Sequence, residues 1–191
     1  MKKIFVLLVI ALVLSLSLPA SAADMGLKRL NGQLGLLFPS TDNISYGVGF
    51  QLGAGADLGE ITDNLHLVPS LSYWILSPEP ESGSVDGFDI SASNFQIAAD
   101  VQYYLKDVKG LYFGGGLSIN FKSVSWDVPH EYAPYFPSSS DSETSVGIGL
   151  LGGYEMPLNK TTTGFAHLKY NIISDLNTLA IVFGVWFDMK N

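Results

Sequence analysis

The chain has 191 residues, no cysteine and a formal net charge of −8 at pH 7. With 10 lysines and arginines against 18 acidic residues, the composition argues against a nucleic-acid partner, because phosphate contacts need clustered basic side chains. The lack of cysteine means that an exported fold has to hold without disulfides.

A segment typical of export stands at the start of the chain. It opens with two lysines, continues with an apolar run over residues 4–18 and ends in small residues at Ala20–Ala22. This order predicts a Sec signal peptide over residues 1–22 that is removed from the mature protein. An uncleaved anchor helix is the alternative, but the run is shorter than the roughly 20 residues that a membrane span needs. Residues 23–191 are then expected to form a single domain.

Alternation with a period of two is the main pattern of the mature sequence. In the stretch YGVGFQLGAGADL (residues 46–58) every second residue is apolar, and the residues between are glycine, glutamine and aspartate. This is the period of a β-strand, whose side chains point alternately to opposite faces. The pattern recurs in eight segments, which cover residues 28–38, 46–58, 65–75, 92–105, 111–123, 144–156, 164–173 and 178–189.

Two places interrupt the alternation. Pro69 lies inside the third segment, where it lacks an N–H for the sheet and predicts a bulge or a shorter strand. After Phe121 the pattern shifts by one residue, so that Val124 and Trp126 change faces. This shift predicts either a bulge or a strand that leaves the barrel wall.

The connections between the segments differ in length and composition. Those at 77–91 and 127–142 are long and rich in proline, serine and acids, whereas the others are short. Because antiparallel connections alternate between the two ends of a sheet, both long connections are expected at one end and both termini at the other. The two long connections contain no lysine or arginine and seven acids: Glu79, Glu81, Asp86, Asp89, Asp127, Glu131 and Asp141.

The residue types on the two faces distinguish a membrane barrel from a soluble one. The face opposite the apolar one is mostly glycine, serine, asparagine and glutamine, with few of the charges that a water-facing strand carries. Glycine inside a strand makes sense where space is tight, as in the narrow interior of eight strands. The apolar face is therefore expected to meet lipid and the other to line the lumen. The predicted polar network of the lumen comprises Gln51, Asp100, Gln102, Asn120, Lys122 and Lys169.

Aromatic residues on the apolar face support the same orientation. They gather near both ends of the predicted strands, as expected of girdles at two lipid–water boundaries. A soluble core has no reason to sort aromatic residues in this way. The predicted girdles comprise Phe38, Tyr46, Tyr73, Phe95, Phe121 and Tyr170 near the long connections, and Tyr103, Phe113, Tyr154 and Phe187 near the short ones.

With these features the sequence resembles the small, eight-stranded outer-membrane β-barrel proteins of Gram-negative-type bacteria, the OmpA/OmpX-like barrels. The resemblance covers residues 28–189 and rests on the alternation, the short turns, the long outer connections and the signal peptide. It implies a closed, antiparallel, up-and-down transmembrane barrel in the cell outer membrane, inserted with the help of periplasmic chaperones and the barrel-assembly machinery. Gly184, Phe187 and Met189 resemble the assembly signal of such proteins, although a terminal phenylalanine is lacking.

Motifs of catalysis or cofactor binding are not evident. No nucleotide-binding, zinc-protease or serine-hydrolase motif is present, so no cofactor is predicted. His66 and His167 fall on polar faces near the same end and could together bind a metal, but two hydrogen-bonded luminal histidines are the simpler expectation. The connection 127–142 contains His130 with serines and acids, yet no nucleophile is spaced with a base. No catalytic or metal-binding residue is therefore predicted.

The predicted function is that of a non-enzymatic outer-membrane barrel with a plugged polar lumen. We expect a role in structure, envelope integrity or surface adhesion through the acidic connections 77–91 and 127–142, with outer-membrane lipid as partner. A soluble periplasmic barrel with an oily cavity for a lipid is the first alternative, and a lipid-modifying outer-membrane enzyme is the second. The sequence does not specify an extracellular ligand.

Overall fold

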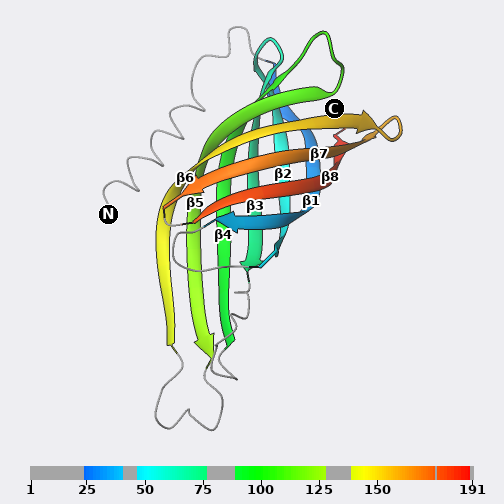
Figure 1. Ribbon diagram of the computed structural model, residues 1–191. Helices are drawn as coiled ribbons and strands as arrows, with labels where there is room; N and C mark the ends of the chain where they lie inside the picture. Colours follow the sequence, from blue (N-terminus) through cyan, green and yellow to red (C-terminus); the bar gives the residue numbers. More distant parts are fainter. Residues whose placement is uncertain (1–23, 41–46, 77–88, 128–138, 175, 190–191) are drawn as a thin grey trace.

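The computed structural model describes residues 24–40, 47–76, 89–127, 139–174 and 176–189. These residues form eight antiparallel strands that close into one barrel (Figure 1). In chain order the strands are β1 (Met25–Ser40), β2 (Gly49–Thr62), β3 (Leu65–Leu76), β4 (Asp89–Tyr104), β5 (Leu111–Asp127), β6 (Ser139–Pro157), β7 (Thr162–Ile173) and β8 (Asn177–Asp188). Each strand pairs with the next, and β8 pairs with β1. The predicted all-β barrel is confirmed, while the predicted signal peptide lies outside the described residues.

The two faces of each strand differ as the alternation predicts. On β2, Phe50 and Leu52 point outward and are 68% and 69% exposed, whereas Asp57 points into the barrel and is 1% exposed. The same division holds on β6, where Ile148 and Leu150 are exposed and Ser145 is buried. An isolated barrel with apolar side chains outside presents a surface suited to lipid, because lipid tails are as apolar as leucine.

Tight turns at one end of the barrel, which we call the short-turn end, fix the ends of the strands. Asn64 and Gly110 have φ angles of 62° and 85°, in the left-handed region that asparagine and glycine tolerate best. The carbonyl of Asn64 accepts from the N–H of Tyr104, and that of Gly110 from the N–H of Glu155, both at 2.8 Å. The turns thus hold Tyr104 and Glu155 in place inside the barrel. Within the described ranges there is no helix long and apolar enough to cross a membrane.

The irregularity predicted at Pro69 lies in the neighbouring strand. β3 is continuous from Leu65 to Leu76 and pairs with β4 in a constant register, so that neither a bulge in β3 nor a shorter β3 is found. The register between β2 and β3 instead shifts between Gly55 and Glu60. Gly59 in this bulge has a φ of 86°. The bulge belongs to β2 because Pro69 leaves a gap in the pairing on that side.

The change of phase after Phe121 marks a strand that extends past the rest of the barrel. β5 keeps one register with β4 and β6 through this segment, which excludes a bulge. Pairing of β3 with β4 ends at Leu76–Ala92, and pairing of β6 with β7 ends at Gly147–Ile173. β4, β5 and β6 therefore continue as a three-stranded extension beyond the barrel wall at the opposite end, the long-connection end (Figure 1).

The interior contains more large apolar side chains than the sequence pattern predicts. They interrupt the alternation on the inward face, where eight strands leave just enough room for side chains to pack. Val124, which changes phase, packs against this cluster. The buried members of the cluster are Leu37, Val68, Trp74, Leu76, Ala92, Phe165, Ile173, Ala180, Val182 and Trp186.

Candidate functional site in the barrel lumen

An ion pair crosses the middle of the lumen. Lys169 Nζ on β7 donates to Asp100 Oδ2 on β4 at 2.6 Å, and the two side chains are 10% and 7% exposed. Gly116 and Gly149, register partners on β5 and β6, lie between these strands. A Cβ atom at Gly149 would lie 2.8 Å from Lys169 Cε, and one at Gly116 2.5 Å from Asp100 Oδ1. The two glycines thus provide the space that the predicted lumen requires.

A cluster of amides lies toward the long-connection end. Asn120 Oδ1 accepts from Asn94 Nδ2 at 3.1 Å and from Gln96 Nε2 at 2.8 Å. Asn120 Nδ2 in turn donates to Ser118 Oγ at 3.0 Å. All four residues are buried, and a buried polar group is stabilising only when it has such partners.

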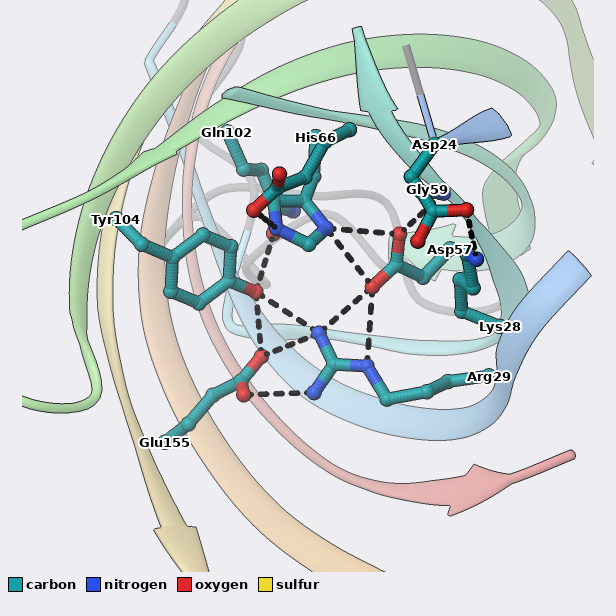
Figure 2. Close-up of polar contacts among 10 residues, drawn as sticks. Asp24, Lys28, Arg29, Asp57, Gly59, His66, Gln102, Tyr104 and Glu155 are labelled. Carbon is teal, nitrogen blue, oxygen red and sulfur yellow. Dashed lines mark hydrogen bonds and ion pairs between the residues drawn. The ribbon is translucent and has the colours of Figure 1, made fainter. Parts of the chain in front are cut away.

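Arg29 is the centre of the polar contacts near the short-turn end (Figure 2). Its guanidinium donates to Glu155 Oε2 at 2.8 Å, to the Tyr104 hydroxyl at 3.1 Å and to Asp57 Oδ2 at 3.0 Å. Asp57 Oδ1 also accepts from the N–H of Gly59 at 2.8 Å, so the bulge of β2 supplies a further donor. Arg29 thereby joins β1 to β2, β4 and β6 across the lumen, and its planar fork suits two carboxylates at once.

Arg29 also belongs to a closed ring of side chains, which we call the luminal ring. Its guanidinium lies 4.7 Å from the centre of the Trp186 ring, a cation–π contact across the β1–β8 seam. The remaining contacts are charged or aromatic and follow the strands around the barrel. The contacting pairs are Arg29–Asp57, Asp57–His66, His66–Tyr104, Tyr104–Tyr112, Tyr112–His167, His167–Phe165, Phe165–Trp186 and Trp186–Arg29. Seven strands contribute directly, and β6 joins through Glu155.

The six residues predicted to line the lumen lie in different places. Asp100 and Lys169 form the central ion pair, Asn120 centres the amide cluster, and Gln102 accepts from the Tyr104 hydroxyl at 3.3 Å. Lys122 lies at the rim, where it donates to the Ser174 carbonyl at 3.0 Å and pairs with Glu143 at 3.1 Å. Gln51 is half-buried beside Gly35. The structure therefore separates these side chains into several clusters.

Several luminal residues were missed by the sequence pattern. The cluster in Figure 2 is formed mainly by four residues that were not in the predicted network: Arg29, Asp57, Tyr104 and Glu155. One signal was available, since Arg29 is the only arginine in the chain and shares the polar parity of Asn31. Its partners come from four other strands, and strand periodicity does not reveal which side chains meet across a lumen.

The two luminal histidines do not share a site. His66 Nδ1 lies 3.0 Å from Asp57 Oδ1, whereas His167 Nδ1 lies 3.1 Å from the Tyr112 hydroxyl. Tyr104 and Tyr112 lie between the two histidines in the luminal ring. In the part of the chain that the structure describes, no three metal-ligating side chains gather. His130 lies outside that part.

The predicted girdle residues lie on the outside of the barrel wherever they are described. Two pairs contact each other across strands, Phe95 with Phe121 at 6.2 Å and Tyr103 with Phe113 at 5.4 Å between ring centres. Tyr103 is half-buried, and Tyr46 lies outside the described residues. The exposed members are Phe38, Tyr73, Phe95, Phe113, Phe121, Tyr154, Tyr170 and Phe187.

The barrel is closed, its exterior is apolar, and its interior contains ion pairs and amides. This is the architecture of a transmembrane β-barrel. The comparison with protein families agrees, because residues 8–187 match the outer membrane protein beta-barrel domain. The chain therefore belongs to this family, which places it in the outer membrane, in contact with lipid. In the comparison with curated proteins, no match to the sequence was found.

Solved structures support the fold. A major outer membrane protein from Thermus thermophilus is 15% identical with a TM-score of 0.62, covering 88% of this chain and 100% of that one. Neisserial surface protein A is 14% identical with a TM-score of 0.55, covering 84% and 96%. Ail, the attachment invasion locus protein of Yersinia pestis, is 11% identical with a TM-score of 0.54, covering 85% and 99%. At these identities the likeness concerns the fold alone.

Proposed function

We propose that this protein is a non-enzymatic outer-membrane barrel whose lumen is closed by side chains and whose long-connection end faces outward to serve envelope integrity or adhesion. The observation that carries the proposal is the set of ion pairs and large side chains on the inward face of the barrel. Three groups of side chains lie in the interior: Arg29 with its two carboxylates, the Asp100–Lys169 pair and the apolar cluster. Eight strands leave little room beyond such side chains.

Export and insertion belong to the same proposal. Residues 1–22 serve as a cleaved Sec signal, and periplasmic chaperones and the barrel-assembly machinery deliver residues 23–191 to the membrane as one domain. The aromatic side chains on the outer face form girdles that anchor the barrel at the two lipid–water boundaries. A soluble barrel with an oily cavity is less consistent with the structure, because many large apolar side chains are exposed on the outside while ion pairs and amides lie inside.

The outward end is proposed to act in adhesion through its negative charge. The segments 77–91 and 127–142 carry seven acids and no lysine or arginine, so electrostatic attraction favours cationic ligands. Of these acids, three lie at strand ends rather than in a connection: Asp89 in β4, Asp127 in β5 and Asp141 in β6. Ail has been solved in complex with the heparin analogue sucrose octasulfate. We expect this protein to differ, because its acids would repel a sulfated ligand.

Two measurements test the proposal. In a planar lipid bilayer, the purified protein should give no large and steady single-channel current, and such a current would contradict a closed lumen. Cells that display the protein should adhere to polylysine-coated surfaces more than cells without it, and should lose this difference at high salt, where charges are screened. If adhesion instead requires sulfated glycans, the proposed role of the acids is wrong.

A further inference from the structure

A hollow lies on the outer, lipid-facing side of the barrel wall near the short-turn end, and we call it the outer groove. Its volume is about 340 Å³, which is within the range of sites that hold small molecules. Gly152 on β6 and Ala166 on β7 are the small residues that leave the wall hollow there. The outward-facing residues that line the groove are Leu111, Gly152, Tyr154, Ala166, Leu168 and Ile181.

The space over Gly152 is left open by the protein itself. A Cβ atom added at Gly152 would lie 3.9 Å from the Tyr112 carbonyl oxygen and would meet no other atom within 4 Å. One added at Gly153, which has the inward parity, would collide with His167 Cβ. The wall is therefore packed on its luminal side and hollow on its outer side. Because the outer side meets hydrocarbon in a bilayer, a lipid chain is the molecule available to occupy the hollow.

The turn next to the outer groove is basic. Lys109 precedes Leu111 of the groove by two residues, and the same turn contains Lys106 and a single acid, Asp107. Both lysines are exposed and have no ion-pair partner among the described residues. Two ammonium groups at the end of an apolar groove are complementary to a molecule with a hydrocarbon chain and an anionic head.

Tyr154 shows that the end of the groove coincides with the membrane boundary. Its side chain is 50% exposed on the outer face and lies against the turn, since a Cβ atom added at Gly110 would be 3.3 Å from Tyr154 Cε2. Tyrosine on the outside of a barrel is typical of the lipid–water boundary, where lipid headgroups lie. A chain in the groove would therefore have its headgroup beside Lys109.

We propose that the outer groove binds one anionic phospholipid from the leaflet at the short-turn end. One acyl chain lies over Gly152 and Ala166, and the phosphate accepts hydrogen bonds from the ammonium groups of Lys106 and Lys109. Chain packing alone selects no lipid, because all lipid tails are apolar. The lysines provide the preference, since basic side chains near a membrane surface attract anionic lipids. The inference goes beyond the proposed closed lumen and adhesion, and lipid binding in micelles does not depend on which end of the barrel faces outward.

Native mass spectrometry of the mature barrel, released from detergent micelles that contain palmitoyl-oleoyl phosphatidylglycerol, tests the proposal. We expect one lipid to bind more tightly than any further one, and more tightly than phosphatidylcholine with the same chains. Gly152→Leu fills the groove and should weaken binding of this first lipid about tenfold. Ala99→Leu is the matched control, because Ala99 lies between the exposed Ile97 and Val101 on β4, outside the groove, and this variant should bind as wild type does.

Headgroup recognition is tested by removing charge at the turn. Lys106→Gln and Lys109→Gln should each reduce the preference for phosphatidylglycerol over phosphatidylcholine about fivefold. Lys28→Gln is the control, because the charge of Lys28 is already paired with Asp24, and it should leave the preference unchanged. Equal binding of the two lipids by wild type, an undiminished preference in both turn variants, or undiminished binding of the first lipid by Gly152→Leu would overturn the proposal. A barrel dimer that Gly152→Leu abolishes would also overturn it, since the groove would then belong to a second copy of the chain.

Discussion

The inner and outer faces of the barrel wall are built from the same strands but follow different rules. On the outer face, Phe50 and Leu52 are largely exposed, and lipid surrounds any apolar side chain equally well. On the inner face, Arg29 has defined partners on four other strands. The comparison teaches that the contacts between particular side chains lie in the lumen, while the outer face needs only to be apolar.

The largest expected effect comes from breaking the luminal ring. Arg29→Ala leaves Asp57 and Glu155 buried without their cation, and should reduce the free energy of unfolding by about 3–5 kcal/mol, the cost of removing one partner of a buried ion pair. Urea unfolding in lipid vesicles measures this loss. Lys28→Ala is the control, because its pair with Asp24 lies at the surface and is worth about 0–1 kcal/mol. If Arg29→Ala and Lys28→Ala lost equal unfolding free energy, the contacts in the lumen would be no more stabilising than those at the surface.

Leucines on the two faces offer a matched comparison without charge. Leu76 is buried inside and 0% exposed, whereas Leu150 is outside and 57% exposed. Leu76→Ala should cost about 2–5 kcal/mol because it leaves a cavity among close-packed neighbours. Leu150→Ala should cost clearly less, since lipid tails fill the space that it leaves. The same urea titration measures both, and a larger loss for Leu150→Ala would contradict the assignment of faces.

Adjacent positions on β2 give the smallest of the three expected effects. Leu52→Arg places a charge in the bilayer and should destabilise the folded barrel by about 2–4 kcal/mol near the midplane. Gln51→Arg, on the lumen side, should cost less where neighbouring polar groups can adapt. The ratio of folded to unfolded protein after insertion into vesicles compares the two. A similar loss for both variants would show that the lumen is as intolerant of charge as the lipid face.

Much of the fold was predictable because a strand divides its residues between two faces at every second position. This period located all eight strands, and the glycines among them indicated a narrow interior. The bulge was harder to place. Pro69 signalled an irregularity, but the sheet accommodates it in β2, on the side where the pairing is broken. The sequence could not reveal which strand contains the bulge, since its position depends on the register of the neighbouring strand.

The candidate site was predictable only in part. Asp100 and Lys169 were expected inside and lie there, yet their pairing across two intervening strands follows from the curvature of the closed wall. Trp74, Leu76 and Trp186 share the parity of the polar residues on their strands, and the sequence pattern did not single them out. In the barrel all three are buried in the apolar cluster. Sequence periodicity contains no information on the distance between side chains that face each other across a lumen.

By itself the sequence determined the number of strands, the face on which each side chain lies and the lipid surroundings, since these depend on local alternation and on residue chemistry. Tertiary structure alone decided that one arginine joins β1 to β2, β4, β6 and β8, that a ring of side chains closes near the short-turn end, and that β4, β5 and β6 extend beyond the barrel wall. These features depend on which strands close the barrel and how far each extends. Both are set by the pairing of segments that are distant in the chain.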